Sequence, residues 1–244
     1  MTIISTDQAH GNLIYWVADN VIADDFPPVD TALRDPDGLL AIGGDLSIPR
    51  LLEAYKRGIF PWYSEGQPIL WWSPNPRCVI ELKNFRIARS LRKKLKSGKY
   101  QVTFNRAFPD VIRLCAEPRS GHDGTWITRD IITTYTRLHN LKYALSVETW
   151  HDEALCGGLY GVVIGRVFFG ESMFSRESDA SKIAMARLVE VLQQNQFRII
   201  DCQVYSRHLQ SLGATPMERN KFVNILNRYC SENIVYQWPE HPVV

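Results

Sequence analysis

The stretch LCGGLYGVVIGRVFFGESMFSRESDASKIAMARLVEVLQQNQFRIIDCQV, residues 155–204, decides how the chain folds. Two β-rich runs, 155–164 and 166–174, meet at Gly165, and glycine suits a tight hairpin turn because it tolerates a positive φ. Apolar residues at helical spacing follow, and another short β-rich run closes the stretch. The sequence therefore predicts a hairpin, a helix and a strand in direct succession.

The predicted helix begins after Ser178 or Asp179, either of which can cap it, and ends near Asn195. Its apolar stripe consists of Ile183, Ala186, Leu188, Val191 and Leu192. The predicted strand after it covers 198–204 and ends in polar residues.

Polar side chains near the ends of these strands are the candidates for chemistry. Side chains alternate across a strand, so Asp201 and Gln203 point to one face and Cys202 to the other. A strand end that emerges into solvent explains this pair equally well. Glu171 favours a functional site, because it lies in an apolar run where an ionised carboxylate costs several kcal/mol unless it is paired. A polar focus in an apolar wall is typical of a small-substrate site.

Length and composition are those of an ordinary globular protein. The chain has 244 residues, of which 45% are hydrophobic and 22% charged, enough for one large or two modest domains. No apolar run approaches the roughly 20 residues that span a bilayer, and the N-terminus lacks the features of a signal peptide. The five cysteines are scattered without a CxxC motif, which favours reduced thiols in a cytoplasm and argues against structural zinc.

A basic segment covers residues 83–100, which hold eight Lys or Arg and no acid. It fits a helix over 86–96, since Ile87, Leu91 and Leu95 recur every four residues and leave the cations on the other face. Such a face is usually only solvated, but the absence of acids favours contacts with the phosphates of a polyanion. The candidate phosphate-binding residues are Arg86, Arg89, Arg92, Lys93, Lys94 and Lys96.

An aromatic segment, 58–77, holds Trp62, Trp71 and Trp72 among four prolines. This density of proline predicts an ordered loop or an edge segment rather than a helix or a central strand. Aromatic residues that bury a proline-rich crossing between two domains are the more common case. The alternative is a stacking platform for a nucleobase.

The order of the elements predicts an α+β fold. Further helices are expected from a cap at Ser47 to Gly58 and over 105–116, 128–140, 206–213 and 220–229, with a strand over 143–150. Residues 1–33 give no clear pattern. Helices followed by strand, hairpin, helix and strand match an acetyltransferase-like core, in which a mixed sheet holds an acyl donor beside an amine.

Nearly the whole sequence resembles the leucyl/phenylalanyl-tRNA-protein transferases. The words that carry this resemblance are GLLAIGGDLS, RGIFPWY, ILWWSPNPR, RSLRK, GTWIT, LHNLKYALSVETW, GGLYGV, FFGESMFS, ASK, IDCQ and HLQSLGA. So many long words in one order are highly specific.

The resemblance implies a cytoplasmic enzyme that moves Leu or Phe, and less well Met, from aminoacyl-tRNA to an N-terminal Arg or Lys of a protein and so marks it for degradation. It implies a small N-terminal domain, 1–74, and an acetyltransferase-like (GNAT-like) catalytic domain, 75–244. The expected form is a monomer without cofactor, metal or membrane attachment.

The resemblance also assigns site residues. The IDCQ word places the catalytic pair on Asp201 and Gln203, and Trp62 and Trp126 match positions that contact the terminal adenosine. The pocket for the transferred side chain is expected to consist of Leu159, Phe168, Met185, Leu188 and Ile200, with Glu171 at its edge.

An aminoacyl ester is already activated, so amide formation from it needs neither ATP nor metal. The hypothesis is that the side-chain oxygen of Gln203 accepts a hydrogen bond from the incoming amine and orients it, while Asp201 fixes Gln203 and stabilises the positive charge that develops on nitrogen.

Three other functions compete. An acyl-CoA-dependent N-acetyltransferase has the same fold, but such enzymes carry a glycine-rich pyrophosphate loop where this chain reads SRESDAS. A tRNA-binding module without activity leaves Glu171, Asp201 and Gln203 without a role. Cys202 as an acyl-carrying nucleophile lacks a histidine near it in sequence.

Overall fold

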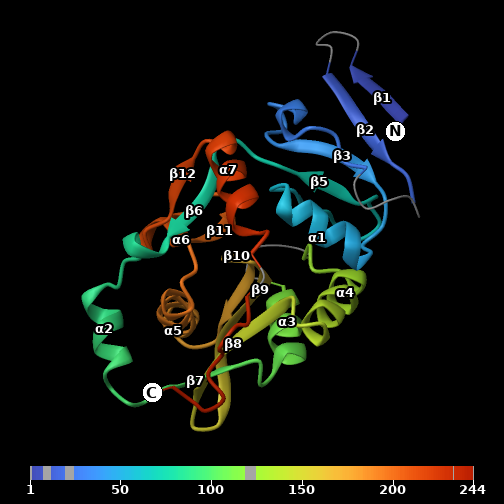
Figure 1. The fold of residues 1–244 in the computed structure, drawn as a ribbon. Helices are drawn as coiled ribbons and strands as arrows, with labels where there is room; N and C mark the ends of the chain where they lie inside the picture. The colour runs from blue at the N-terminus through green and yellow to red at the C-terminus, as the bar shows by residue number, and fades with distance from the viewer. Residues whose placement is uncertain (1, 8–11, 20–24, 119–124, 233, 244) are drawn as a thin grey trace.

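Two mixed β-sheets organise the computed structural model, which describes residues 2–7, 12–19, 25–118, 125–232 and 234–243. In Figure 1 the smaller sheet lies at the upper right and the larger one runs through the centre of the molecule. Among these residues, no helix combines the length and apolarity that a membrane crossing requires.

The smaller sheet contains the N-terminal strands. Its order is β1 (Thr2–Asp7), β2 (Asn12–Val17), β3 (Leu39–Gly43), β5 (Leu70–Trp72) and β4 (Phe60–Pro61). β2 and β3 are parallel and the other pairs are antiparallel. The proline-rich segment therefore supplies an edge strand, β4, and one interior strand, β5.

The larger sheet carries the stretch that decides the fold. Its order is β12 (Thr215–Met217), β6 (Arg77–Glu81), β11 (Ile199–Gln203), β10 (Val167–Ser175), β9 (Ala154–Ile164), β8 (Ala144–His151) and β7 (Gln101–Phe104). β10 and β11 are parallel and all other pairs are antiparallel. This mixed sheet with helices confirms the predicted α+β class.

Helices cover both faces of the larger sheet (Figure 1). α3 (Phe108–Ala116), α4 (Arg129–Asn140), α1 (Ile48–Lys56) and α7 (Arg219–Tyr229) bury apolar residues with Tyr160 and Phe169. α2 (Arg89–Leu95) and α5 (Ala180–Gln194) bury theirs with Leu159 and Phe168. The alternation along β9 and β10 thus separates two cores. The short helices η1 (Val29–Thr31), η2 (Leu82–Asn84) and α6 (Arg207–Ser211) complete the chain.

The chain passes from the smaller to the larger sheet between Trp72 and Arg77. One core nevertheless joins both sheets, since Trp71 and Phe60 belong to the same buried cluster as Phe108. The division into domains 1–74 and 75–244 therefore stays a prediction.

The predicted hairpin, helix and strand are confirmed. Gly165 makes the hairpin turn at φ +54°, and α5 ends at a C-cap on Asn195. The predicted cap of α5 is wrong, because Asp179 has φ +68° and its side chain makes no capping hydrogen bond. It binds lysines instead, at 2.8 Å from Lys94 Nζ and 3.0 Å from Lys182 Nζ.

Other predictions differ in detail. Ser47 precedes α1 but its side chain does not cap it; its backbone N–H donates to Asp45 Oδ1 at 2.8 Å. The basic helix begins at Arg89 rather than Arg86, so Ile87 precedes it. Strands β1, β2, β3, β6, β7 and β12 were not predicted.

Candidate active site

The candidate site lies where β10 and β11 separate. Their parallel pairing covers three residues of each strand and ends at Phe169 and Asp201. Both strands then change register against their outer neighbours, β10 between Gly170 and Ser172 and β11 between Asp201 and Gln203. Bulges of this kind re-aim side chains and recur next to active sites. Here they direct Glu171 and Gln203 toward each other.

Gln203 is held in one orientation by Glu171. Its Nε2 donates to Glu171 Oε1 at 2.9 Å, which places the amide oxygen on the opposite side of the group. A carboxylate only accepts hydrogen bonds, so the NH₂ end must face it. No hydrogen bond to Gln203 Oε1 occurs within the described part of the chain. The oxygen is therefore free to accept a hydrogen bond from a bound amine.

The backbone of Gln203 is strained. Its φ is +61°, and the N–H of Val204 donates to the carbonyl of Cys202 at 2.7 Å, closing a three-residue turn around it. A non-glycine residue in this region costs about 1–3 kcal/mol and persists only where the surroundings impose it. The strain shows that the position of this carboxamide is imposed by the fold.

Glu171 lies among tyrosines. The hydroxyl of Tyr55 donates to Glu171 Oε1 at 2.8 Å and also contacts the hydroxyl of Tyr135, which is fully buried. Burial and, less strongly, the charge of Asp201 raise the pKa of Glu171, while the hydrogen bonds from Tyr55 and Gln203 lower it; the net pKa is about 7. The carboxyl group of Glu171 thus changes its charge near neutral pH.

Asp201 has a different environment. Its side chain is 0% exposed and pairs with Arg77 through two hydrogen bonds, Nε to Oδ1 at 2.8 Å and Nη2 to Oδ2 at 2.7 Å. Oδ1 also accepts the backbone N–H of Gln203 at 2.9 Å. The Arg77 guanidinium lies 4.6 Å from the Phe60 ring centre and 5.0 Å from that of Phe222. Asp201 therefore holds the turn that presents Gln203, and it lines neither cavity of the site.

The first cavity has a volume of about 710 Å³. Its lining includes the expected apolar residues Leu159, Phe168, Met185 and Ile200 together with Glu171 and Gln203. Leu188, expected in the same pocket, is fully buried in the core behind these residues and does not line it. The volume and apolar wall of this cavity suit a side chain such as leucine or phenylalanine.

The second cavity, about 1100 Å³, contains Trp62 and Trp126. Trp62 is 43% exposed, and the Trp72 indole holds the Trp62 backbone by donating to its carbonyl at 2.7 Å. Trp71, by contrast, is fully buried and donates to the carbonyl of Gly43. The aromatic segment thus combines both interpretations: Trp71 is structural, whereas Trp62 offers a ring to a planar ligand.

The two cavities meet at one place. The residues that line both are Cys115, Glu117, Trp126, Glu171, Cys202, Gln203 and Ser206. An acyl group in the first cavity and a nucleoside in the second would be joined here. Gln203 is therefore at the junction where an ester between the two would lie.

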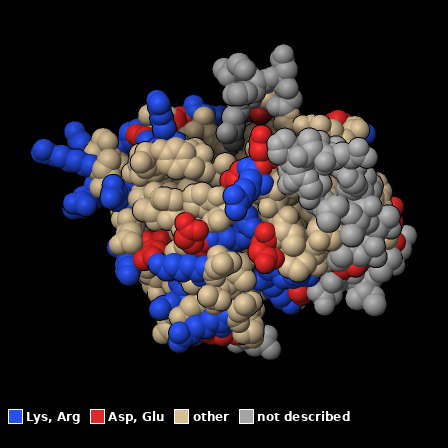
Figure 2. All heavy atoms as spheres, turned by 90° about the horizontal axis from the view of Figure 1, so that it is seen from above, with Lys and Arg blue, Asp and Glu red and all other residues tan. Residues whose placement is uncertain are grey.

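The basic helix α2 lies beside α5 (Figure 1), and Lys and Arg side chains project at the same left edge in Figure 2. Of the candidate phosphate-binding residues, Arg86, Arg89, Arg92, Lys93 and Lys96 are exposed. Lys94 is the exception. Its Nζ donates to the carbonyl of Ser178 at 2.7 Å and to Asp179 Oδ2 at 2.8 Å, so it attaches α2 to the start of α5. The expectation that Lys94 belongs to the free cationic face is therefore corrected.

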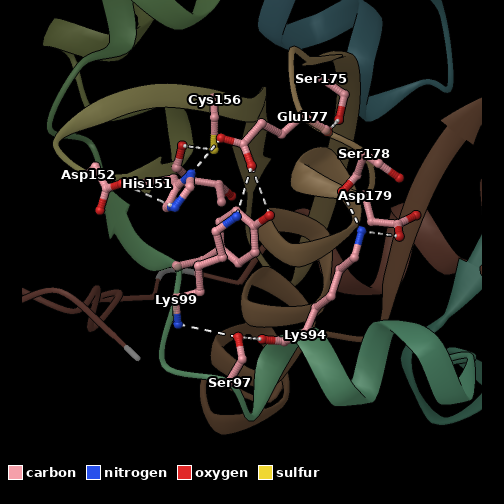
Figure 3. A network of polar contacts seen from close by, with 12 residues as sticks. Lys94, Ser97, Lys99, His151, Asp152, Cys156, Ser175, Glu177, Ser178 and Asp179 are labelled. Carbon is pink, nitrogen blue, oxygen red and sulfur yellow. Dashed lines mark hydrogen bonds and ion pairs between the residues drawn. The ribbon is translucent and has the colours of Figure 1, made fainter.

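The segment before α5 belongs to a polar network, shown in Figure 3. Glu177 accepts from the Tyr100 hydroxyl at 2.9 Å and contacts His151 Nδ1 at 2.7 Å. The hydrogen bonds from His151 and Tyr100 lower the pKa of Glu177. Two carboxylates, Glu177 and Asp179, thus lie in the segment directly before α5.

Cys202 lines both cavities, but its chemistry is that of an inert thiol. The contact with the Cys78 thiol and burial hold the pKa of Cys202 well above its usual value. A protonated thiol is a weak nucleophile. This environment disfavours an acyl-cysteine intermediate.

Sequence reasoning missed the residues that support the site. The sequence pattern places Tyr55 on the buried face of a helix, Tyr135 in another helix and Arg77 in a matching word, and it gives none of them a role. Arg77 is 124 positions from Asp201, so no local pattern reveals their pairing. A lone arginine at the end of a proline-rich segment was the available signal.

Comparisons with known proteins give the family of this chain. The model of the family "Leucyl/phenylalanyl-tRNA protein transferase" matches residues 79–227, and that of its N-terminal domain matches residues 44–75. A leucyl/phenylalanyl-tRNA–protein transferase from Aromatoleum aromaticum is 56% identical over 90% of this chain and 92% of its own length. The protein of the same name from Cellvibrio japonicus is 52% identical over 90% and 93%.

Among solved structures, a GCN5-related N-acetyltransferase from Kribbella flavida superposes with a TM-score of 0.39 at 9% identity, over 68% of this chain and 59% of that one. L-PGS from Bacillus licheniformis gives 0.38 at 10% identity, over 70% and 57%. The matches to the family models and to the close relatives are decisive, and the chain belongs to the leucyl/phenylalanyl-tRNA protein transferase family.

Proposed function

We propose that this chain transfers Leu or Phe, and less well Met, from aminoacyl-tRNA to the N-terminal Arg or Lys of acceptor proteins, which marks them for degradation. The observation that carries the proposal is the fixed carboxamide of Gln203 at the junction of an apolar and an aromatic cavity. Membership of the family supports it. The proposed working form is a cytoplasmic monomer.

The donor fits the two cavities end to end. Trp62 and Trp126 would stack on the terminal adenosine, and Phe168 and Met185 would contact the transferred side chain. The ester carbonyl then lies near Gln203. The exposed cations in and beside α2 would bind phosphates of the same tRNA.

The reaction needs orientation more than a strong base. The acceptor's α-amino group has a pKa of about 7.7–8.0, so a substantial fraction is neutral near pH 7.5. Gln203 Oε1 accepts an N–H of this amine, which directs the lone pair at the ester carbonyl. A C–N bond forms and the ester C–O bond breaks; the amine loses a proton and the ribose oxygen gains one. Gln203 is thus the catalytic residue and Asp201 a positioning residue.

The direct test is transfer of labelled Leu, Phe and Met from their tRNAs to a peptide that begins with Arg. We expect transfer in the order Leu or Phe before Met, and no transfer to a peptide that begins with Gly. Calorimetry with acetyl-CoA examines the competing acetyltransferase, and we expect no binding because Glu177 and Asp179 would face its pyrophosphate. Binding of acetyl-CoA without peptide transfer would reverse the assignment.

Ionisation of Glu171 should control the pH profile. Ionised Glu171 accepts from Gln203 Nε2 and fixes the amide, whereas protonated Glu171 can donate and allow the amide to flip. Because its pKa is about 7, turnover should rise as the pH increases through about 7. In Glu171→Gln this rise in turnover should disappear, and only the rise caused by deprotonation of the acceptor amine at higher pH should remain. Turnover of the wild-type enzyme and of Glu171→Gln, measured from about pH 5.5 to 9, tests this prediction.

The same shift has an effect on stability. The folded pKa of Glu171, about 7, lies above the ordinary value of 4.5, so the unfolded chain loses this proton first. The contribution of Glu171 to the free energy of unfolding should therefore fall as the pH rises from about 4.5 to about 7. Glu171→Gln should make the free energy of unfolding depend less on pH in this range. An unchanged dependence would contradict the raised pKa of Glu171.

Charge reversal on α2 should weaken donor binding. Arg92→Glu with Lys93→Glu should raise the Michaelis constant for aminoacyl-tRNA without changing which tRNA is preferred, because phosphates carry no sequence information. The logarithm of the association constant for aminoacyl-tRNA falls as the logarithm of the salt concentration rises. The slope of this plot should become shallower by about 1 for each phosphate that the helix no longer binds. Lys94→Ala is the control within the same helix, since Lys94 binds Asp179 and should leave the slope unchanged. Equal slopes for the wild-type enzyme, the double variant and Lys94→Ala would show that the tRNA binds another surface.

A further inference from the structure

A third cavity lies at the other end of β11 from Gln203. β6 and β11 are antiparallel, so Glu81 at the end of β6 pairs with Ile199 at the start of β11. At about 3.3 Å per residue, Ile199 is roughly 13 Å from Gln203 along the strand. Among the described residues, none lines both this cavity and a cavity of the candidate active site. A ligand held here would therefore make a contact separate from the reacting ester.

The third cavity is a groove between elements that cover opposite faces of the sheet. Its walls are the end of β6 with η2, the connection from α5 to β11, and α7. Gln193 in α5 joins two of these walls, because its Nε2 donates to the carbonyl of Leu82 at 3.1 Å. The volume of the groove, about 730 Å³, falls within the range of roughly 300–1,000 Å³ that is typical of ligand sites.

Exposed cations dominate this groove, which we call the basic groove. Lys83, Arg198, Lys221 and Arg228 line it, against Glu81 as the acid among the described lining residues. Glu81 lies 3.3 Å from Lys83 Nζ. Within the part of the chain that the structure describes, no acid pairs with Arg198, Lys221 or Arg228. A concave surface that carries one sign of charge raises the local concentration of ligands of the opposite sign.

The two arginines of the basic groove share one aromatic ring. The guanidinium carbons of Arg198 and Arg228 lie 5.1 Å and 5.2 Å from the ring centre of Tyr229. The backbone carbonyl of Tyr229 in turn accepts the N–H of Arg166 at 2.9 Å, which ties the end of α7 to the β-hairpin. A guanidinium held in this way loses less freedom when it binds, and its planar fork matches the oxygens of a phosphate.

The basic groove continues the basic segment of residues 83–100. Lys83 begins this segment and lines the groove, and Arg86 and Arg89 follow it toward α2. A duplex nucleic acid carries phosphates at regular intervals along its whole length, so one molecule can contact α2 and the groove together. A short acidic peptide would fill the groove without reaching α2. The continuity of the two surfaces therefore favours RNA as the occupant.

We propose that the basic groove binds the ribose–phosphate backbone of the tRNA body, away from the aminoacyl end, through Arg198 and Arg228. This surface rests on the proposed function and gives the donor a second anchor beyond α2. Its contribution to affinity does not depend on the amino acid that the tRNA carries, because phosphate contacts position a nucleic acid without reading it.

The test compares two donors of different size. Arg198→Glu with Arg228→Glu should raise the Michaelis constant for Leu-tRNA at least about tenfold at an unchanged turnover number, because phosphate contacts become repulsive. The association constant for uncharged tRNA should also depend less on salt, with a logarithmic slope shallower by about 2 for two lost phosphate contacts. Adenosine esterified with phenylalanine has no tRNA body, so its Michaelis constant and turnover number should stay those of the wild-type enzyme. This small donor also verifies that the variant is folded.

Two further variants separate the groove from net charge. Arg137→Glu with Lys142→Glu makes the same change of charge at exposed positions that line neither the basic groove nor the active-site cavities. It should leave the Michaelis constant for Leu-tRNA nearly unchanged. Arg198→Gln with Arg228→Gln removes the cations without adding acids, and we expect a smaller rise of the same constant.

The results separate this proposal from the function on which it rests. A wild-type enzyme that transfers an amino acid from neither donor would end the proposed function. Wild-type transfer together with an unchanged Michaelis constant for Leu-tRNA in Arg198→Glu with Arg228→Glu would overturn the groove alone. An equal rise in the Arg137 and Lys142 control would overturn it as an effect of net charge. Loss of polyglutamate binding with unchanged tRNA binding would assign the groove to an acidic protein and also overturn the proposal.

Discussion

Gln203→Ala is expected to lower the turnover number about 10²–10³-fold, with an unchanged Michaelis constant for aminoacyl-tRNA. The size follows from the loss of one pre-oriented hydrogen-bonding group that acts on the reacting atoms. Donor binding should persist because the tryptophans and the apolar wall of the cavities do not involve this side chain. Steady-state rates at saturating Arg-initiated peptide, with the donor concentration varied, measure both quantities.

A second substitution protects this result from a folding artefact. Gln203 has φ +61°, a region that glycine adopts without strain. Gln203→Gly should therefore be at least as stable as the alanine variant and equally inactive. Gln193→Ala is the control, because this exposed carboxamide donates to the carbonyl of Leu82 outside both cavities. Turnover near the wild-type rate in Gln203→Gly would remove Gln203 from the mechanism.

The strained turn also shows where sequence analysis stops. Alternation along a strand predicted that Asp201 and Gln203 share a face, and their type predicted a polar focus with Glu171. The hydrogen bond between Gln203 and Glu171 depends on two bulges and on the separation of β10 from β11. These are set by packing across the sheet, so a period of two residues cannot reveal them.

Elements that carry a strong local signal were predicted well. Gly165 and the apolar stripe of α5 fixed the hairpin and the helix, because glycine in a turn and helical spacing act within a few residues. Short strands such as β6 and β12 were missed, since three to five residues hold too little periodicity. The C-terminal segment was also unreadable, yet Val243 pairs with Val102 of β7 in both directions.

Lys94 and Leu188 illustrate a different limit. Each has the residue type that its expected role requires, a cation on a basic face and an apolar residue on a pocket-lining helix. The position of each residue on its helix gives it a different contact from the expected one: Lys94 faces Asp179, and Leu188 faces the core. A helical pattern separates the buried from the exposed face but does not say which cavity or which neighbour a side chain meets.

Asp201→Ala is expected to lower the free energy of unfolding by about 3–5 kcal/mol, because it leaves the buried guanidinium of Arg77 without its carboxylate. This is a large part of the roughly 5–15 kcal/mol that stabilises a typical domain. Denaturant unfolding near neutral pH measures it. Asp110→Ala is the matched control, since its ion pair with Arg113 is exposed and contributes about 0–1 kcal/mol.

Loss of activity in Asp201→Ala alone would not separate positioning from unfolding, so a double variant is needed. Arg77→Met with Asp201→Leu replaces the ion pair by apolar groups of similar size, which often restores stability. The backbone N–H of Gln203, which now donates to Asp201 Oδ1 at 2.9 Å, would still lack its acceptor. We expect the double variant to unfold near the wild-type denaturant concentration and to turn over slowly. Recovery of stability together with full turnover would show that Gln203 keeps its place without Asp201, whereas recovery of stability alone makes Asp201 the residue that positions the catalytic carboxamide.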